Sequence, residues 1–287
     1  MLRTHRDSPL LFSRLIKPGP MRNTVNDAIS YSIGAGGKGI RRQLANAATK
    51  AVNPASHPII NNIADALECI HTYSLIHDDL PAMDDDDMRR GKPSCHVVYG
   101  EAIAILAGDA LQAKAFELIA DAPELSANQK VQMVKVLASA AGAEGMVGGQ
   151  AIDIESEGQS LTLDELRELH GLKTGALIRA SVILGGIAAG ASQQQLDALD
   201  RFADQIGLAF QVVDDALDVE GSTEALGKTQ GKDQDADKAT YVKLLGLEGA
   251  KAEAQNLLAS ALEALESFGS HADELRELAH FIVSRDR

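Results

Sequence analysis

Apolar residues recur along most of this chain at the spacing of an α-helix. Between residues 59 and 75, isoleucine, alanine and leucine return at steps of three, four or five positions, which places them on one helical face. No sustained alternation of apolar and polar residues, the pattern of a half-buried strand, competes with this periodicity. We therefore predict an all-α protein.

The periodic stretches are separated by short segments rich in glycine and proline, which end helices. Thr162 and Glu165 have the spacing of a capping box at one helix start. Several stretches lack a strongly polar face, so we expect a single large bundle of more than four helices, forming one domain over residues 1–287. Besides the helix that leads up to Asp78, we predict helices over residues 24–33, 40–52, 101–120, 128–154, 163–189, 193–218, 238–268 and 272–284.

Charge narrows the classes of function. The net charge is -14, from 41 acidic against 27 basic residues, which argues against a nucleic-acid partner. Nine of the surplus negative charges belong to aspartates in two groups, at positions 78–87 and 214–218. Carboxylates this close repel one another unless they are solvated or share a divalent cation. The two groups are therefore candidate metal sites.

The remaining composition indicates a cytoplasmic protein. The two cysteines, Cys69 and Cys95, lack the spacing of a metal or redox motif, which fits a reducing compartment. The apolar run at residues 10–12 is too short for a signal peptide. The longest apolar stretch, residues 181–191, is about half the length that spans a bilayer, so we predict a buried helix and no membrane span.

The second acidic group has helical geometry. Gln211, Asp214, Asp215 and Asp218 follow the i, i+3, i+4, i+7 pattern and form one polar stripe on an otherwise apolar segment. Carboxylates in apolar surroundings need cations. A helix end with a solvated acidic face is the alternative for this segment taken alone.

The first acidic group is interrupted by Pro81. In a continuous helix Asp84 would point about 120° away from Asp78, but proline makes that continuity unfavourable. A local loop could instead return Asp84 to Asp78 at a shared ion; the alternative is a solvated acidic loop. Hard oxygen ligands select Mg²⁺, Ca²⁺ or Mn²⁺, and Mg²⁺ completes its shell with water and substrate phosphates. An EF-hand is excluded because its loop pattern is absent.

Residues 68–91 and 210–218 resemble the first and second Asp-rich motifs of the trans-prenyl diphosphate synthase family. The four residues between Asp79 and Asp84 resemble the bacterial farnesyl diphosphate synthase (geranyltranstransferase) form, and the similarity extends from about Ser13 to the end of the sequence. The resemblance implies a helical bundle of the isoprenoid synthase type with a central substrate cavity. It also implies a homodimer.

The activity implied by this resemblance is a head-to-tail 1'-4 condensation. Several Mg²⁺ ions, or Mn²⁺ in their place, activate the diphosphate of dimethylallyl or geranyl diphosphate, and the C1–O bond ionises. The alkene of isopentenyl diphosphate then attacks the allyl cation in a pocket that excludes water, and a C2 proton is lost. The expected product is farnesyl diphosphate.

The same resemblance assigns roles residue by residue. Beside the three principal metal ligands Asp78, Asp84 and Asp214, Lys173 and Lys228 are expected to act in catalysis. Arginine can hold phosphate through two donors, whereas lysine acts as a point charge. The expected metal ligands are Asp78, Asp84 and Asp214, followed by Asp79 and Asp218. The residues expected to bind isopentenyl diphosphate are Lys38, Arg41, His71 and Arg90. The residues expected to bind the allylic diphosphate are Arg89, Lys173, Thr174, Gln211, Lys228 and Lys232.

The segment around Lys38 departs from the family pattern. Gly39 stands where the family usually has arginine and Arg42 where it has proline, so the affinity for isopentenyl diphosphate and the rigidity of this loop are open. Tyr73 and Ser74 lie about one helical turn before Asp78, where the family has the floor of the product cavity. Ser74 is expected to admit a ten-carbon substrate and Tyr73 to stop growth near fifteen carbons.

Other functions remain as alternatives. The product could be geranyl or geranylgeranyl diphosphate, or the chain could be a non-catalytic partner subunit of an active synthase. A class I terpene cyclase normally lacks the second Asp-rich motif and the Lys38/Arg41 site, which disfavours that class.

Overall fold

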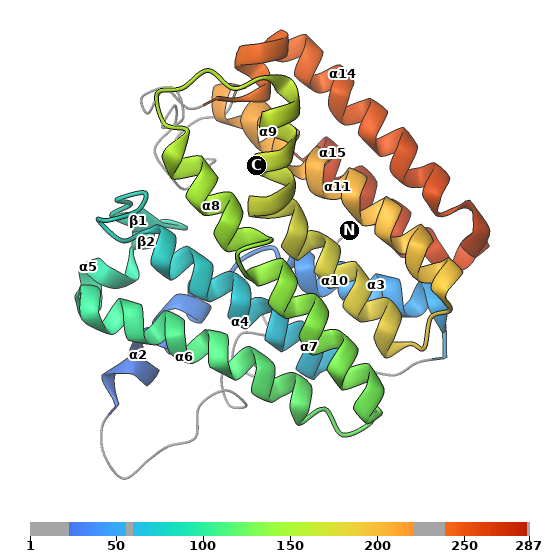
Figure 1. The fold of residues 1–287 in the computed structure, drawn as a ribbon, viewed down its shortest axis with the longest axis horizontal. Helices are drawn as coiled ribbons and strands as arrows, with labels where there is room; N and C mark the ends of the chain where they lie inside the picture. Colours follow the sequence, from blue (N-terminus) through green and yellow to red (C-terminus); the bar gives the residue numbers. More distant parts are fainter. Residues whose placement is uncertain (1–22, 56–59, 221–238, 286–287) are drawn as a thin grey trace. The chain divides into compact units, whose positions relative to one another are not determined.

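The computed structural model describes residues 23–55, 60–220 and 239–285, and helices dominate these ranges (Figure 1). Within them the strands are limited to β1 (Met88–Arg89) and β2 (Lys92–Pro93), which pair antiparallel. The prediction of an all-α protein is confirmed.

The contacts divide the chain into two compact units, each made of two separate stretches. The first unit comprises Met1–Ile40 and Asp65–Asp121, and the second comprises Arg41–Ala64 and Ala122–Arg287. Helix α4 (Ile60–Asp78) has residues in both. The single domain expected from the sequence remains a prediction.

The first unit contains the first acidic group. Helix α2 (Thr24–Gly34) begins where the Asn23 side chain accepts from the Val25 amide, and it packs on α5 (Cys95–Tyr99) and α6 (Glu101–Ala120). Tyr31 fixes this packing, because its ring meets Tyr99 edge-on at 5.7 Å and its hydroxyl donates to the Pro93 carbonyl at 2.7 Å. The rest of the unit is the greater part of α4 and the β1–β2 hairpin.

The second unit contains the second acidic group. Helix α11 (Gln193–Glu220) packs on α10 (Ala176–Ala188), α14 (Tyr241–Ala264) and α15 (Asp273–Ser284), and Figure 1 shows α10, α11 and α14 side by side. Apolar residues of α11 join residues of α9 and α14 in a buried cluster comprising Leu166, Ala209, Val212, Val213, Tyr241, Ala250, Ala254 and Leu257. The other elements of the unit are α3 (Ile40–Val52), α7 (Ala127–Ala141), α8 (Met146–Glu155), α9 (Leu163–His170), the π-helical turn η1 (Gly171–Gly175) and the 3₁₀ segment η2 (Glu266–Ala272).

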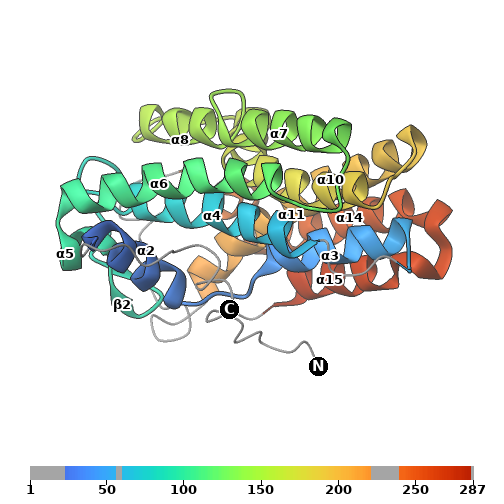
Figure 2. The same cartoon turned by 90° about the horizontal axis from the view of Figure 1, so that it is seen from below.

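The helix predicted over residues 128–154 is wrong, because it is two helices. Helices α7 and α8 follow one another (Figure 2) but are separated by Gly142–Gly145, where Gly142 is extended. A Cβ atom on Gly145 would lie 2.3 Å from the Ala140 carbonyl oxygen, so this bend depends on glycine. Apolar spacing continues across the break and therefore gave no sign of it.

The stretch predicted over residues 163–189 is continuous but irregular. Thr162 and Glu165 form the predicted capping box, with the Thr162 amide donating to Glu165 Oε2 at 2.8 Å. The π-helical turn at residues 171–175 was not predicted. The helix predicted over residues 238–268 begins later, at Tyr241, and is interrupted at Gly246, whose φ of 71° lies in the left-handed region.

Most of α10 is buried, which confirms the buried helix predicted at residues 181–191. In the part of the chain that the structure describes, Leu163–Ala188 is long and apolar enough to cross a membrane by length and composition. Half of its most apolar window is nevertheless buried inside the protein, as in a core helix.

Candidate active site

The loop after α4 folds back on the helix end. The Asp84 amide donates to the Asp78 carbonyl at 2.8 Å, and the Asp86 amide donates to the Asp79 carbonyl at 3.2 Å. Pro81 lies in the turn between them, where its missing N–H leaves no helical bond broken. The backbone of Asp84 therefore returns to Asp78, while the shared ion remains a prediction.

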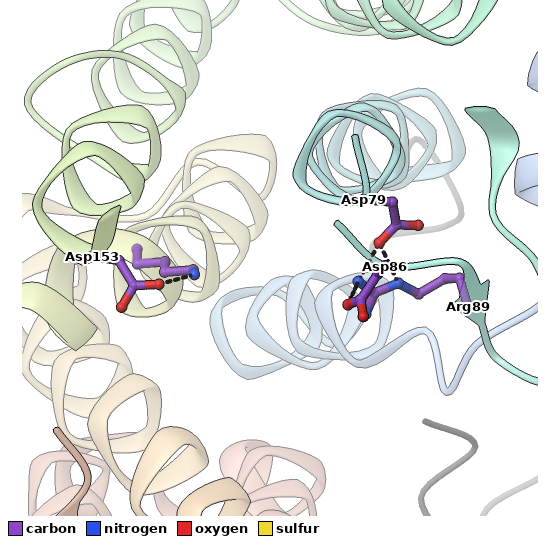
Figure 3. Close-up of polar contacts among 5 residues, drawn as sticks. Asp79, Asp86, Arg89 and Asp153 are labelled. Carbon is purple, nitrogen blue, oxygen red and sulfur yellow. Dashed lines mark hydrogen bonds and ion pairs between the residues drawn. The ribbon is translucent and has the colours of Figure 1, made fainter. Parts of the chain in front are cut away.

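Arg89 closes this loop through two carboxylates (Figure 3). Its Nε donates to Asp79 Oδ1 at 2.9 Å, its Nη2 contacts the same oxygen, and Nη2 also lies 3.2 Å from Asp86 Oδ2. Asp79 is only 2% exposed, so the guanidinium supplies the positive charge that a buried carboxylate requires. Asp79 and Arg89, predicted to bind metal and diphosphate respectively, are thus paired with each other.

The hairpin separates Arg89 from its neighbour Arg90. Arg90 and Gly91 have φ of 54° and 74° and form the two-residue connection between β1 and β2. Arg90 Nη2 lies 3.5 Å from His71 Nε2, and its guanidinium lies against Gly37, where a Cβ would come within 2.9 Å. The first unit therefore brings together two of the residues predicted to bind isopentenyl diphosphate.

The remaining predicted residues of that subsite lie on the segment before α3 and on its first turn. Lys38 is exposed in the first unit, and Arg41 is half-buried in the second. Gly39, which departs from the family pattern, has a φ of 59°. A side chain at this position would be strained, so the local backbone agrees with glycine.

The predicted stripe on α11 is present, but burial divides it. Asp214 is 46% exposed at its side chain, whereas Asp215 and Asp218 are 3% and 4% exposed. The Asp214 Oδ1 accepts from Arg285 Nη2 at 2.6 Å, and the same guanidinium donates to the Phe210 carbonyl at 2.7 Å. Asp215 Oδ2 instead accepts from the Tyr241 amide at 2.8 Å.

The π-helical turn presents Lys173 and Thr174 to neighbouring helices. Thr174 Oγ1 donates to Gln211 Oε1 on α11 at 2.9 Å, and Lys173 Nζ lies 2.7 Å from Asp153 Oδ2 on α8 (Figure 3). A Cβ on Gly149 would lie 2.2 Å from the Lys173 amide nitrogen, so glycine allows α8 to approach this turn. Such π-helical turns are frequent at functional sites. Three residues predicted to bind the allylic diphosphate are therefore gathered in the second unit.

The two residues predicted to set product length are buried in α4. Tyr73 is 5% exposed and its ring meets His77 at 5.6 Å, while Ser74 is 8% exposed and donates from Oγ to the His71 carbonyl at 2.9 Å. Burial raises the pKa of the Tyr73 hydroxyl above its ordinary value, with a smaller opposing effect from Gln112. Lys228 and Lys232 lie outside the described residues.

Three charged residues of these sites were assigned no role from the sequence: Asp86, Asp153 and Arg285. Asp153 follows the buried Gln150 by three residues in an apolar segment, so the two polar residues lie on one helical face, which is the signal that the sequence offers for Asp153. Asp86 was assigned no role from the sequence, yet it contacts Arg89. Arg285 carries no local signal, because its partner Asp214 is 71 residues earlier.

The described residues hold no group of three or more histidine, cysteine or acidic side chains close enough to bind a metal ion on their own. Mg²⁺ in proteins is usually bound through one or two carboxylates together with water and substrate phosphates. Asp214 is partly exposed, and Arg285 engages its Oδ1. Its chemistry and position thus suit a hard cation.

The chain is similar to known proteins over most of its length. A model of the polyprenyl synthetase family matches residues 22–279. Farnesyl diphosphate synthase of Escherichia coli (strain K12) is 49% identical over 96% of this chain and 94% of its own length, and a chloroplastic geranylgeranyl pyrophosphate synthase of Catharanthus roseus is 47% identical over 91% and 74%. The crystal structure of a geranyltransferase from Helicobacter pylori, complexed with magnesium and isoprenyl diphosphate, superposes with a TM-score of 0.83 at 35% identity, covering 96% of this chain and 93% of that one.

Proposed function

Because the chain belongs to the polyprenyl synthetase family of prenyl-transferring enzymes, we propose that it condenses isopentenyl diphosphate with dimethylallyl or geranyl diphosphate to give (2E,6E)-farnesyl diphosphate. The C1–O bond of the allylic substrate breaks, C1 bonds to the alkene carbon C4 of isopentenyl diphosphate, and a C2 proton and diphosphate are released. The E. coli relative named farnesyl diphosphate synthase supports the fifteen-carbon product.

The contact between Thr174 and Gln211 is the observation that carries this proposal. It joins the turn bearing Lys173 to the helix bearing Asp214, at 2.9 Å between Oγ1 and Oε1. The turn η1 supplies the cation of Lys173 and the hydroxyl of Thr174, and α11 supplies an amide and a carboxylate. Together these groups are of the kinds that bind a diphosphate and its counter-ion. Lys173 would exchange its contact with Asp153 for a phosphate oxygen and stabilise the leaving group. Lys228 and Lys232 are proposed to add positive charge there.

Magnesium is the proposed cofactor, with Mn²⁺ able to replace it because both are hard cations that prefer oxygen. Asp78, Asp84 and Asp214 would be the principal ligands of several ions, with Asp79 and Asp218 after them. Bound Mg²⁺ would neutralise the charge that develops on the departing diphosphate. The contact of Asp79 with Arg89 supports a lesser role for Asp79 as a direct ligand.

The isopentenyl diphosphate subsite is proposed to consist of Lys38, Arg41, His71 and Arg90. Burial lowers the pKa of Arg90, and the nearby Glu68 carboxylate raises it, so the guanidinium stays charged at neutral pH. The distance of 3.5 Å between Arg90 and His71 supports their sharing one phosphate group.

We also propose a homodimer in the cytoplasm. Four apolar side chains of the first unit are 43–51% exposed, and such a patch supports self-association. They are Val97, Val98, Ile105 and Leu106. The cytoplasmic assignment is supported by Cys69 and Cys95, which are both buried and both in the thiol form.

The test is incubation of the purified chain with isopentenyl diphosphate and, in separate reactions, dimethylallyl or geranyl diphosphate, with and without Mg²⁺, followed by chromatography of the dephosphorylated products. We expect farnesol only when Mg²⁺ is present. A twenty-carbon alcohol would instead establish the geranylgeranyl alternative, and product from dimethylallyl diphosphate that stops at ten carbons would establish the geranyl one. No product with Mg²⁺ would support a non-catalytic subunit, and full turnover in EDTA would refute the metal mechanism.

A further inference from the structure

Asp215 lies in the middle of the acidic stripe, yet its surroundings differ from those of Asp214. The Asp215 side chain is 3% exposed and both of its oxygens receive hydrogen bonds from protein groups. One comes from the backbone amide of Tyr241 and the other from the side-chain amide of Gln211. Successive helical positions point about 100° apart, so neighbouring aspartates face different partners.

The first contact anchors the start of α14. Tyr241 is the first residue of that helix, and amides of a first helical turn have no partner within the helix. Asp215 Oδ2 accepts from the Tyr241 amide at 2.8 Å, and a carboxylate at this end also interacts favourably with the helix dipole. Thr240 satisfies a second amide, that of Lys243, at 3.2 Å.

The second contact sets the orientation of Gln211. Its Nε2 faces Asp215 Oδ1 at 3.5 Å, which turns its Oε1 toward Thr174 Oγ1 at 2.9 Å. A carboxylate accepts hydrogen bonds but cannot donate them, so Asp215 favours this orientation of the amide over the flipped one. Thr174, Gln211, Asp215 and Tyr241 therefore form one chain of hydrogen bonds across η1, α11 and α14, in which two donors converge on Asp215.

The Tyr241 ring closes the arrangement from the other side. It is fully buried and lies 5.6 Å from the ring of His170, the residue immediately before the π-helical turn. Arg167 also reaches Glu253 of α14, with Nη2 2.7 Å from Oε1. The start of α14 is thus tied to the turn that carries Lys173 and Thr174 by both the hydrogen-bond chain and these ring and ion-pair contacts.

We propose that Asp215 is a positioning residue that anchors α14 and orients Gln211 and Thr174 toward the allylic diphosphate, and that it does not bind metal. The assignment of the ligand rests on the function proposed above. The structural part does not, because the anchoring of Tyr241 can be measured without substrate.

Two substitutions separate the two roles. Asp215→Ala removes both contacts. Asp215→Asn retains an oxygen for the Tyr241 amide but presents an NH₂ group to Gln211. The Gln211 amide must then flip, which reverses its hydrogen bond with Thr174 and makes the Thr174 hydroxyl the acceptor. If the alanine variant does not fold, the nearly isosteric asparagine variant still tests the orientation of Gln211.

Hydrogen exchange of the α14 amides, Mn²⁺ binding in the presence of inorganic pyrophosphate, and KM for geranyl diphosphate supply the readouts. We expect exchange at the start of α14 to rise about tenfold or more in Asp215→Ala and to stay near wild type in Asp215→Asn. KM should rise in both variants, while Mn²⁺ affinity changes less than about threefold. Asp214→Ala, in contrast, should weaken Mn²⁺ binding about tenfold or more or lower the number of bound ions, because Asp78 and Asp84 remain.

Loss of Mn²⁺ binding in Asp215→Ala with unchanged exchange in α14 would overturn the proposal and make Asp215 a metal ligand. Unchanged KM in Asp215→Asn would overturn the orienting role. If wild type forms no product and Asp214→Ala leaves Mn²⁺ binding intact, the proposed function fails, whereas the anchoring of α14 still stands or falls on the exchange data.

Discussion

Arg285 places its guanidinium 3.9 Å above the ring of Phe210 and donates to Asp214 Oδ1 at 2.6 Å. The arginine side chain is only 3% exposed, so this is a desolvated contact with one of the principal proposed metal ligands. An oxygen that is fixed by an outer partner leaves the other oxygen of the carboxylate in a defined direction.

We predict that Arg285→Leu lowers the free energy of unfolding of the metal-free protein by about 1–3 kcal/mol, because the Phe210 carbonyl and Asp214 lose a charged donor. Urea unfolding in EDTA measures this. Arg285→Lys is the control that keeps the positive charge but cannot donate to both oxygens as a guanidinium does. Its free energy of unfolding should lie between those of the wild type and Arg285→Leu. Equal stability of all three proteins would contradict the structural importance of this contact.

Turnover should depend on Asp78 and Asp214. We expect Asp78→Ala and Asp214→Ala each to lower kcat by about 100-fold or more, because charge on the departing diphosphate is no longer compensated. Circular dichroism should show intact helices. Asp87→Ala is the matched control, since this exposed aspartate lies in the same loop, and its turnover should stay near wild type. Near-normal rates in the first two variants would show that the clusters are only solvated surfaces.

Product length should respond to Tyr73 and Ser74. Tyr73→Ala is expected to lengthen the products, because it removes a buried ring, and Ser74→Phe to shorten them by filling space one position away. Chromatography of the products reports this directly. Tyr73→Phe is the control, since it keeps the ring and should keep the length. Unchanged lengths in all variants would remove these residues from the cavity floor.

Stability should fall at alkaline pH partly through Tyr241. Burial raises the pKa of its hydroxyl, Asp215 and Glu253 raise it further, and Arg167 lowers it. The unfolded chain releases this proton near pH 10, but the folded protein retains it. The contribution of Tyr241 is therefore fully present below about pH 10 and is lost as the pH rises toward the folded pKa. Unfolding free energies from pH 8 to 11 should decline less steeply in Tyr241→Phe, and parallel curves would contradict this assignment.

Much of the fold followed from apolar spacing, since helices α3 and α6 begin and end at the predicted residues. The acidic stripe of α11 was predictable for the same reason, because its spacing is a property of the helix itself. The difference in burial between Asp214 and Asp215 was not predictable from this spacing. Asp215 is buried and bonded to the amide of Tyr241, 26 residues later, whereas Asp214 stays partly exposed.

The breaks were harder to predict than the helices. Gly142 and Gly145 lie in a stretch whose apolar periodicity continues, and the bend there depends on close backbone contacts that composition does not reveal. The pairing of Arg89 with Asp79 likewise depends on the hairpin geometry, whereas the resemblance assigned that arginine to a diphosphate.

The π-helical turn at Gly171–Gly175 joins α9 and α10 into one continuous helical stretch, in which the side chains of α10 are rotated about the axis relative to those of α9. Each residue of a regular helix advances about 100°, so the extra residue in this turn rotates everything after it relative to everything before it. Deleting one of these five residues would restore a regular helix, keep nearly the same composition, and turn the contact face of α10 away from α11 while α9 stayed on α14. The contacts that Lys173 and Thr174 make with α8 and α11 therefore depend on the length of this turn.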